Sequence, residues 1–183
     1  MRTLTLENAA YLPELCKLIE EGKRVGLPAT GTSMRPWIEP GRHVLVLGPA
    51  DSYRVGDVAL AEVAPGHFVV HRIIRICTPE GKQVEGLCSE PLAHVTLQGD
   101  GCIGKTEQCT LRRLRARLEA IATHQMQTGT RGQISTSSRR WRLYSRLWLW
   151  LRPLRRPLLA LHRLIWHHQL PARWLKTNPY TIP

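Results

Sequence analysis

Residues 57–77, with the sequence DVALAEVAPGHFVVHRIIRIC, contain two apolar runs separated by Ala64-Pro65-Gly66. Short runs rich in Val, Ile and Phe are typical of β-strands, and a Pro-Gly pair suits a turn that needs a positive φ. The stretch therefore predicts strands at 57–63 and 68–77. Further runs of this kind predict strands at 24–29, 43–47, 83–87 and 94–98. Together they favour a mainly β, α+β fold with one compact β domain.

A short amphipathic helix is predicted before the first strand, at 12–21. Leu12, Leu15, Cys16 and Ile19 share one helical face, and Gly22 is placed to end the helix. The segment 110–123 remains open. Its leucines have helical spacing, but its apolar residues from 114 to 122 also alternate as in a strand.

The length of 183 residues allows one ordinary hydrophobic core with appendages. We expect a domain at 1–125 and a helical tail at 139–183. A linker rich in Thr, Ser, Gly and Gln is expected between them, at 126–138, with no means of packing.

The positive charge is concentrated in the C-terminal part of the chain. The net charge is +12, from 26 Lys and Arg against 14 Asp and Glu. Residues 1–119 hold 15 of these basic residues and all 14 acidic ones, so the remaining 11 basic residues leave the later part strongly cationic.

Five of the six tryptophans lie in the tail, among nine arginines between Arg139 and Arg173. Its leucines follow helical spacing, with Pro153 and Pro157 separating two helices. Trp and Arg on amphipathic helices suit an anionic membrane surface, which is the first interpretation. Alternatively, the leucine face packs on the β domain and the arginines are solvated. No recognised nucleic-acid motif supports a third interpretation, binding to phosphates and bases.

Neither a metal nor a cofactor is predicted. Five cysteines give an odd count and no Cys-x-x-Cys pair, so reduced thiols in the cytosol are expected. The N-terminal residues contain no apolar stretch long enough for a signal peptide or an anchor. We therefore expect a cytoplasmic protein, attached through 139–183 to the inner face of the membrane if the first interpretation of the tail holds.

A candidate nucleophile lies in Gly31-Thr32-Ser33-Met34-Arg35-Pro36, between a predicted strand and a turn-rich stretch. Serine at a sharp chain reversal is exposed, and the glycine lets a substrate approach the backbone amides. Alone, the string also fits a plain turn serine.

Three later segments resemble, in order, the boxes of the signal-peptidase and SOS-repressor superfamily of serine peptidases. They are Gly56-Asp57-Val58-Ala59-Leu60, Val69-Val70-His71-Arg72-Ile73-Ile74 and Leu97-Gln98-Gly99-Asp100-Gly101. With the serine box they cover residues 23–107. The resemblance is greatest to small soluble bacterial members with a histidine base.

The resemblance implies a signal-peptidase-like β domain in which Ser33 attacks the scissile carbonyl and His71 accepts its proton. Asp100 would orient the imidazole, or else cap a turn. Gly31, Thr32 and Met34 would line the cleft or the oxyanion site. The chain departs from the family in having histidine where most bacterial signal peptidases have lysine, and in having Cys102 where an asparagine is frequent.

The function expected from this resemblance is a serine endopeptidase that cleaves a protein or peptide, such as a leader segment, through an acyl-enzyme. Two alternatives remain open. One is a catalytically silent relative that binds an extended peptide by strand addition. The other is a repressor-like regulator whose basic tail contacts DNA.

Overall fold

The computed structural model describes residues 8–123 and 133–167, which adopt the mainly β, α+β fold that the sequence predicts. One antiparallel sheet has the strand order β1-β2-β7-β3-β4-β5-β6, and β8 pairs with β7 outside this path. The strands are β1 (Val25–Pro28), β2 (His43–Gly48), β3 (Val58–Ala64), β4 (His67–Cys77), β5 (His94–Gln98), β6 (Glu107–Thr110), β7 (Leu114–Thr123) and β8 (Ile134–Ser135).

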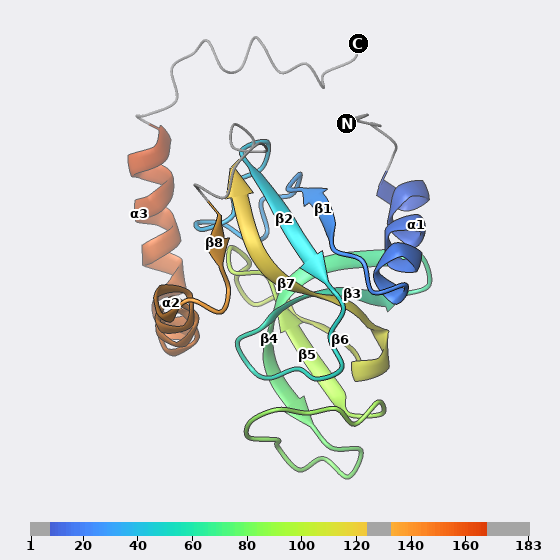
Figure 1. The fold of residues 1–183 in the computed structure, drawn as a ribbon. Coiled ribbons are helices and arrows are strands. Elements are labelled where there is room, and N and C mark those ends of the chain that lie inside the picture. The colour runs from blue at the N-terminus through green and yellow to red at the C-terminus, as the bar shows by residue number, and fades with distance from the viewer. Residues whose placement is uncertain (1–7, 124–132, 168–183) are drawn as a thin grey trace.

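The helices lie on two sides of the sheet. In Figure 1, α1 (Asn8–Glu20) lies on one side, and α2 (Arg139–Trp150) and α3 (Arg155–His167) lie on the other. The 3-10 turn η1 (Leu111–Arg113) precedes β7, and the 3-10 turn η3 (Arg152–Leu154) joins α2 to α3. None of the helices in the described ranges is long and apolar enough to cross a membrane.

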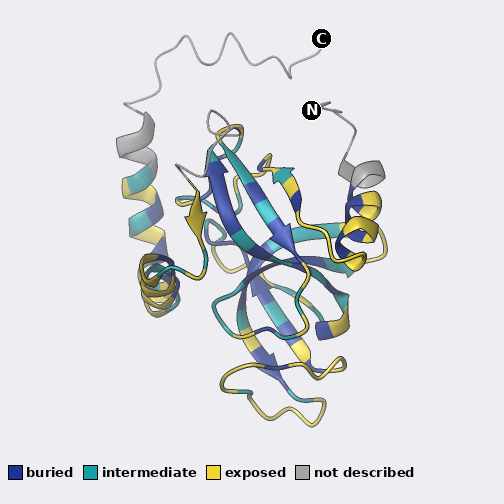
Figure 2. Cartoon of the chain, viewed as in Figure 1, coloured by how far each residue is buried: buried dark blue, intermediate teal, exposed yellow. Residues whose placement is uncertain are grey.

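Strand β3 separates two hydrophobic cores. Val58 and Leu60 belong to a core shared with α1, β1 and β2, whereas Ala59 and Ala61 belong to a core shared with β4 and β5. Side chains alternate between the two faces of a strand, so both faces of β3 are covered. This explains the continuous apolar run in β3, and Figure 2 shows buried residues along the central strands.

Most predicted strands form within two residues of their expected limits. The prediction of a strand at 83–87 is wrong, because only Gln83 forms an isolated bridge there, to Cys77, and the next bridge, from Cys88 to Tyr53, lies just beyond. The open segment 110–123 is chiefly the strand β7. The alternation of its apolar residues, and not the helical spacing of its leucines, matches the structure, because β7 lies between β2 and β3 in the sheet.

The predicted linker is only partly unpaired. Ile134 and Ser135 pair with Ile121 and Ala120 of β7, and the Thr136 hydroxyl donates to the Leu118 carbonyl at 2.9 Å. The expectation that 126–138 has no means of packing is therefore wrong for 134–136. Backbone pairing needs no apolar side chains, so composition does not reveal it. Residues 126–132 lie outside the described residues.

Candidate active site

Ser33 lies in the turn that follows β1. Its side chain is half-buried, while the neighbouring Met34 and the nearby Ile38 are buried in the core and anchor the turn. The amide of Gly101 donates to the Ser33 carbonyl oxygen at 2.7 Å. This bond holds the serine turn against the loop that follows β5.

His71 lies on β4, opposite Ala59 of β3, and only 6% of its surface is exposed. Its Nδ1 is 2.9 Å from Oε2 of Glu107, the first residue of β6. Burial lowers the pKa of His71 below the ordinary histidine value, and Glu107 offsets part of this lowering. The imidazole is therefore neutral near pH 7, as a general base must be.

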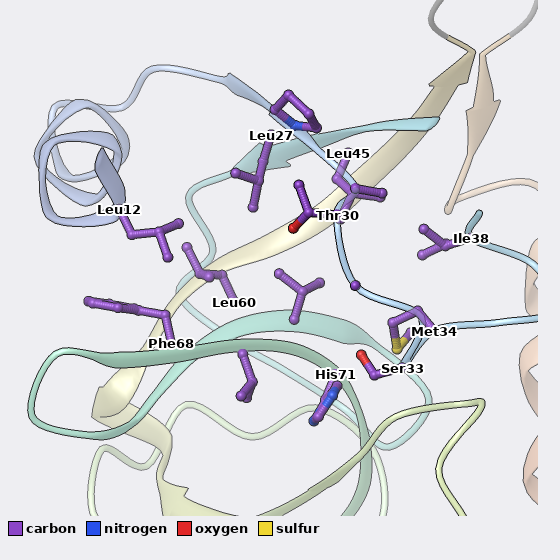
Figure 3. Close-up of a pocket in the computed structure, with 15 residues that line it drawn as sticks. Leu12, Leu27, Thr30, Ser33, Met34, Ile38, Leu45, Leu60, Phe68 and His71 are labelled. Carbon is purple, nitrogen blue, oxygen red and sulfur yellow. The ribbon is translucent and has the colours of Figure 1, made fainter. Parts of the chain in front are cut away.

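Gly99 lies against both the backbone of Ser33 and the ring of His71. A Cβ added there would lie 3.1 Å from His71 Nε2 and 2.5 Å from the Ser33 carbonyl oxygen. Both residues line one end of the same pocket, and Figure 3 shows the Ser33 hydroxyl and the His71 ring beside each other. No hydrogen bond joins the two side chains among the described residues. Catalytic hydrogen bonds are frequently long in unliganded enzymes and tighten when substrate binds.

The pocket has a volume of about 200 Å³ and is mainly apolar. Side chains from five elements (α1 and β1 to β4) and from the serine turn line it. They include Leu12, Leu27, Met34, Leu45, Leu60 and Phe68. A cleft of this kind accepts an apolar side chain next to Ser33.

The predicted oxyanion residues surround the serine. The Ser33 amide has no intramolecular acceptor among the described residues, as an oxyanion donor requires. A Cβ added at Gly31 would lie 4.0 Å from Ser33 Oγ, so this position faces the nucleophile. Gly31 and Met34 line the pocket. Thr32 is exposed, and its carbonyl oxygen would lie 3.0 Å from a Cβ added at Gly101.

Asp100 does not orient His71, and this prediction is corrected. Both of its carboxylate oxygens bind Arg72, at 2.8 Å to Nε and 2.6 Å to Nη2. Arg72 follows His71 on the strand and therefore points to the opposite face. Arg72 and Asp100 are completely buried, so the Gly-Asp box supplies the partner of a structural arginine.

The tail completes the surroundings of Arg72. The Ser145 hydroxyl accepts from Arg72 Nη1 at 2.6 Å, and the guanidinium lies 5.4 Å from the ring centroids of both Trp141 and Tyr144. Tyr144 also stacks on Trp37 of the domain, with centroids 4.6 Å apart. Helix α2 of the tail therefore packs on the domain.

The packing face of the tail differs from the predicted one. In α2 the buried residues are Trp141, Ser145 and Trp148, whereas Leu143 and Leu147 are exposed. The prediction that a leucine face packs on the domain is wrong for α2. Aromatic rings stack on Trp37 and Arg72 and so bury more area there than leucines would.

Glu107 is the candidate functional residue that the sequence did not predict. It lies outside all four boxes, on a strand that was not predicted, and it pairs across the sheet with Leu97. One signal was present in the sequence, because Glu107 is the only acidic residue between Asp100 and Glu119. Its proximity to His71 depends on the pairing of β4, β5 and β6.

Comparison with known proteins finds no family model, no curated protein and no solved structure that matches this chain. The site is therefore interpreted from its own geometry and from the sequence motifs.

Proposed function

We propose that the chain is a serine endopeptidase in which Ser33 is the nucleophile, His71 the general base and Glu107 the residue that orients the imidazole. The observation that carries the proposal is the part-buried His71–Glu107 contact, at the end of a pocket that Ser33 also lines. A serine hydroxyl is a weak nucleophile without a neighbouring base.

The contact with Glu107 favours one tautomer of His71. An ionised carboxylate only accepts hydrogen bonds, so the neutral ring carries its proton on Nδ1 and leaves Nε2 as the acceptor. Nε2 is the atom near Gly99 and the serine turn. It takes the proton of Ser33 as Oγ attacks the scissile carbonyl, and then delivers it to the leaving amine. Water activated by the same nitrogen hydrolyses the acyl-enzyme.

The substrate proposed for this site is an extended peptide with an apolar side chain. The apolar pocket beside Ser33 accepts that side chain. Strand β1 is at one end of the sheet and leads directly into the serine turn. An extended peptide can pair with its outer edge by strand addition.

The test combines a fluorophosphonate probe, which labels activated serines, with cleavage of a pool of peptides read by mass spectrometry. The intact chain should become labelled at Ser33 and should cleave after apolar residues. Ser33→Ala should abolish both reactions. His71→Ala should lower the labelling rate by about 10²- to 10⁴-fold, which is the usual contribution of a general base.

The matched control is Ser89→Ala, which removes an exposed serine and should leave both reactions unchanged. The double variant Ser33→Ala/His71→Ala should cleave peptides little more slowly than either single variant, because members of one catalytic unit are not additive. Near wild-type cleavage in His71→Ala would overturn the mechanism. Peptide binding without cleavage or labelling, equal in wild type and Ser33→Ala, would instead favour a silent peptide-binding protein.

A further inference from the structure

A second cavity, of about 300 Å³, lies between the loop after β5 and the junction of η3 with α3. Three arginines line it, Arg152, Arg155 and Arg156, together with Gln98 and Cys102. No acidic residue belongs to its described lining. The cavity is therefore strongly positive.

Arg155 is buried at this cavity with unused donors. Only 3% of its surface is exposed. Its Nη1 donates to Gln98 Oε1 at 2.9 Å, but Nε and Nη2 have no hydrogen-bond partner among the described residues. Unpaired donors of a buried guanidinium are costly, so these two point to a missing acceptor.

The buried charges near Arg155 do not balance. Asp100 is the acidic residue whose charge acts on Arg155, but both of its oxygens already bind Arg72. Arg72, Asp100 and Arg155 together leave one buried positive charge, and burial lowers the pKa of Arg155. An anion in the cavity would neutralise this charge.

The start of α3 adds to the positive potential. This helix has 13 residues, begins at Arg155 and has no acidic residue in its first turn. The Arg155 amide already donates to the Arg152 carbonyl and Pro157 has no amide hydrogen, so this contribution comes from the dipole of the whole helix. A positive helix end and arginine forks are typical of sites that bind the oxygens of phosphate groups.

An exposed apolar stripe adjoins the cavity along the tail. Trp150 is 75% exposed, and Leu143, Leu147 and Leu154 are also exposed, at spacings of three and four residues. Leu154 lies in η3 between the cavity residues Arg152 and Arg155. Exposed Trp and Leu next to arginines match the interface of a membrane, where apolar side chains enter the lipid and cations meet headgroup phosphates.

We propose that this cavity binds the phosphate of an anionic phospholipid headgroup and that the stripe of Leu143, Leu147, Trp150 and Leu154 enters the lipid beside it. The buried guanidinium of Arg155 binds the phosphate from inside the cavity. The exposed Arg152 and Arg156 bind it from the rim. The proposal does not depend on peptidase activity.

The test compares two pairs of exposed arginines in the full-length chain. Arg152→Gln/Arg156→Gln removes two charges from the cavity, and Arg142→Gln/Arg146→Gln removes two from α2 outside it. The probe is vesicles of equal parts phosphatidylglycerol and phosphatidylcholine. The cavity pair should bind at least about tenfold more weakly than the control pair, because it loses charge-assisted hydrogen bonds as well as charge.

Further arms identify the source of the phosphate. Inorganic phosphate, at matched ionic strength, should raise the Tm of the wild type and of the control pair but not of the cavity pair. Arg155→Lys should also lose this shift, because lysine lacks the planar fork. Trp150→Ala should weaken binding to vesicles without changing the response to inorganic phosphate.

Equal weakening of vesicle binding by the two arginine double variants would overturn the cavity as the binding site. Binding would then come from the overall positive charge of the tail. If inorganic phosphate shifts the Tm but the chain does not bind vesicles, the phosphate that the cavity binds does not come from a lipid. Tighter binding to a single-stranded RNA or a DNA duplex than to vesicles, at the same salt concentration, would replace the lipid by nucleic acid.

Discussion

His71 and Arg72 are neighbours on β4, yet their side chains lie in two different environments. His71 faces a pocket of about 200 Å³ and has one ionic contact, with Glu107. Arg72 is fully buried on the other face, where Asp100, Ser145 and the Gly56 carbonyl bind its guanidinium. One face of β4 therefore borders the pocket, and the tail covers the other face.

The difference separates a contact suited to proton transfer from a structural ion pair. The His71–Glu107 contact leaves Nε2 near a second reactive group and beside an apolar pocket. The Arg72–Asp100 contact is bidentate and is covered by aromatic rings of the tail. The first arrangement favours proton transfer, and the second favours a fixed position for the tail.

The largest expected effect is on stability, from Asp100→Asn. This change leaves Arg72 buried without its counter-charge, and breaking a buried pair in this way costs about 3–5 kcal/mol. The Tm should fall on the order of 10 °C for a chain of this size. Urea and thermal unfolding followed by circular dichroism would measure both quantities.

Glu107→Gln is the matched control for Asp100→Asn, since it makes the same acid-to-amide change at a carboxylate whose side chain is 13% exposed. Its free energy of unfolding should change by less than about 2 kcal/mol, because a neutral His71 can still donate to an amide oxygen. The structural role of Asp100 would be wrong if Asp100→Asn stays fully stable while its cleavage rate falls as in His71→Ala. Asp100 would then act in catalysis, as the sequence predicted.

The next effect is on rate, from Glu107→Gln. The amide no longer stabilises the imidazolium that forms when His71 takes the Ser33 proton, so labelling by a fluorophosphonate should slow by about 10- to 10³-fold. Stopped-time mass spectrometry of the intact chain gives the labelling rate. Glu119→Gln, outside the pocket, serves as the control. A normal rate for Glu107→Gln would remove Glu107 from the mechanism.

The fold was largely predictable because its signals are local. Apolar runs separated by Pro and Gly located β1 to β5, with one false strand at 83–87. The short strands β6 and β8 escaped prediction because Glu107–Thr110 and Ile134–Ser135 are mostly polar. Each pairs with the preceding strand through backbone hydrogen bonds, which composition does not encode.

The site was predictable in part for the same reason. Ser33 and His71 belong to ordered sequence boxes, and the structure brings them to one pocket. The carboxylate partner was assigned to Asp100 because it follows a Gly in a box, but orientation depends on which face of a strand or loop a side chain occupies. The sheet register alone determines that Asp100 binds Arg72 and that Glu107 contacts His71.

The smallest expected effect is a shift in the pH dependence of the His71 reaction. Burial lowers the pKa of His71, whereas Glu107 and Asp100 raise it and Lys105 lowers it. The net direction is downward, so the labelling rate of the wild type should rise with pH and reach half its maximum below about 6.5. Glu107→Gln removes a charge that raises the pKa and should move this midpoint to lower pH. Lys105→Gln removes a charge that lowers it and should move the midpoint upward.

The shift from Lys105→Gln should be less than about one pH unit, because the Lys105 side chain is 76% exposed and solvent screens its charge. Lys17→Gln is the control, since that side chain is 67% exposed and has its ion pair with Glu14 on α1. Rates measured from pH 5 to 8 at constant ionic strength define the midpoints. Opposite shifts in the two variants would identify the titrating base as a group on which both charges act, as they do on His71. Shifts of the same sign would mean that another group titrates. The proposal that His71 is the general base would then fail.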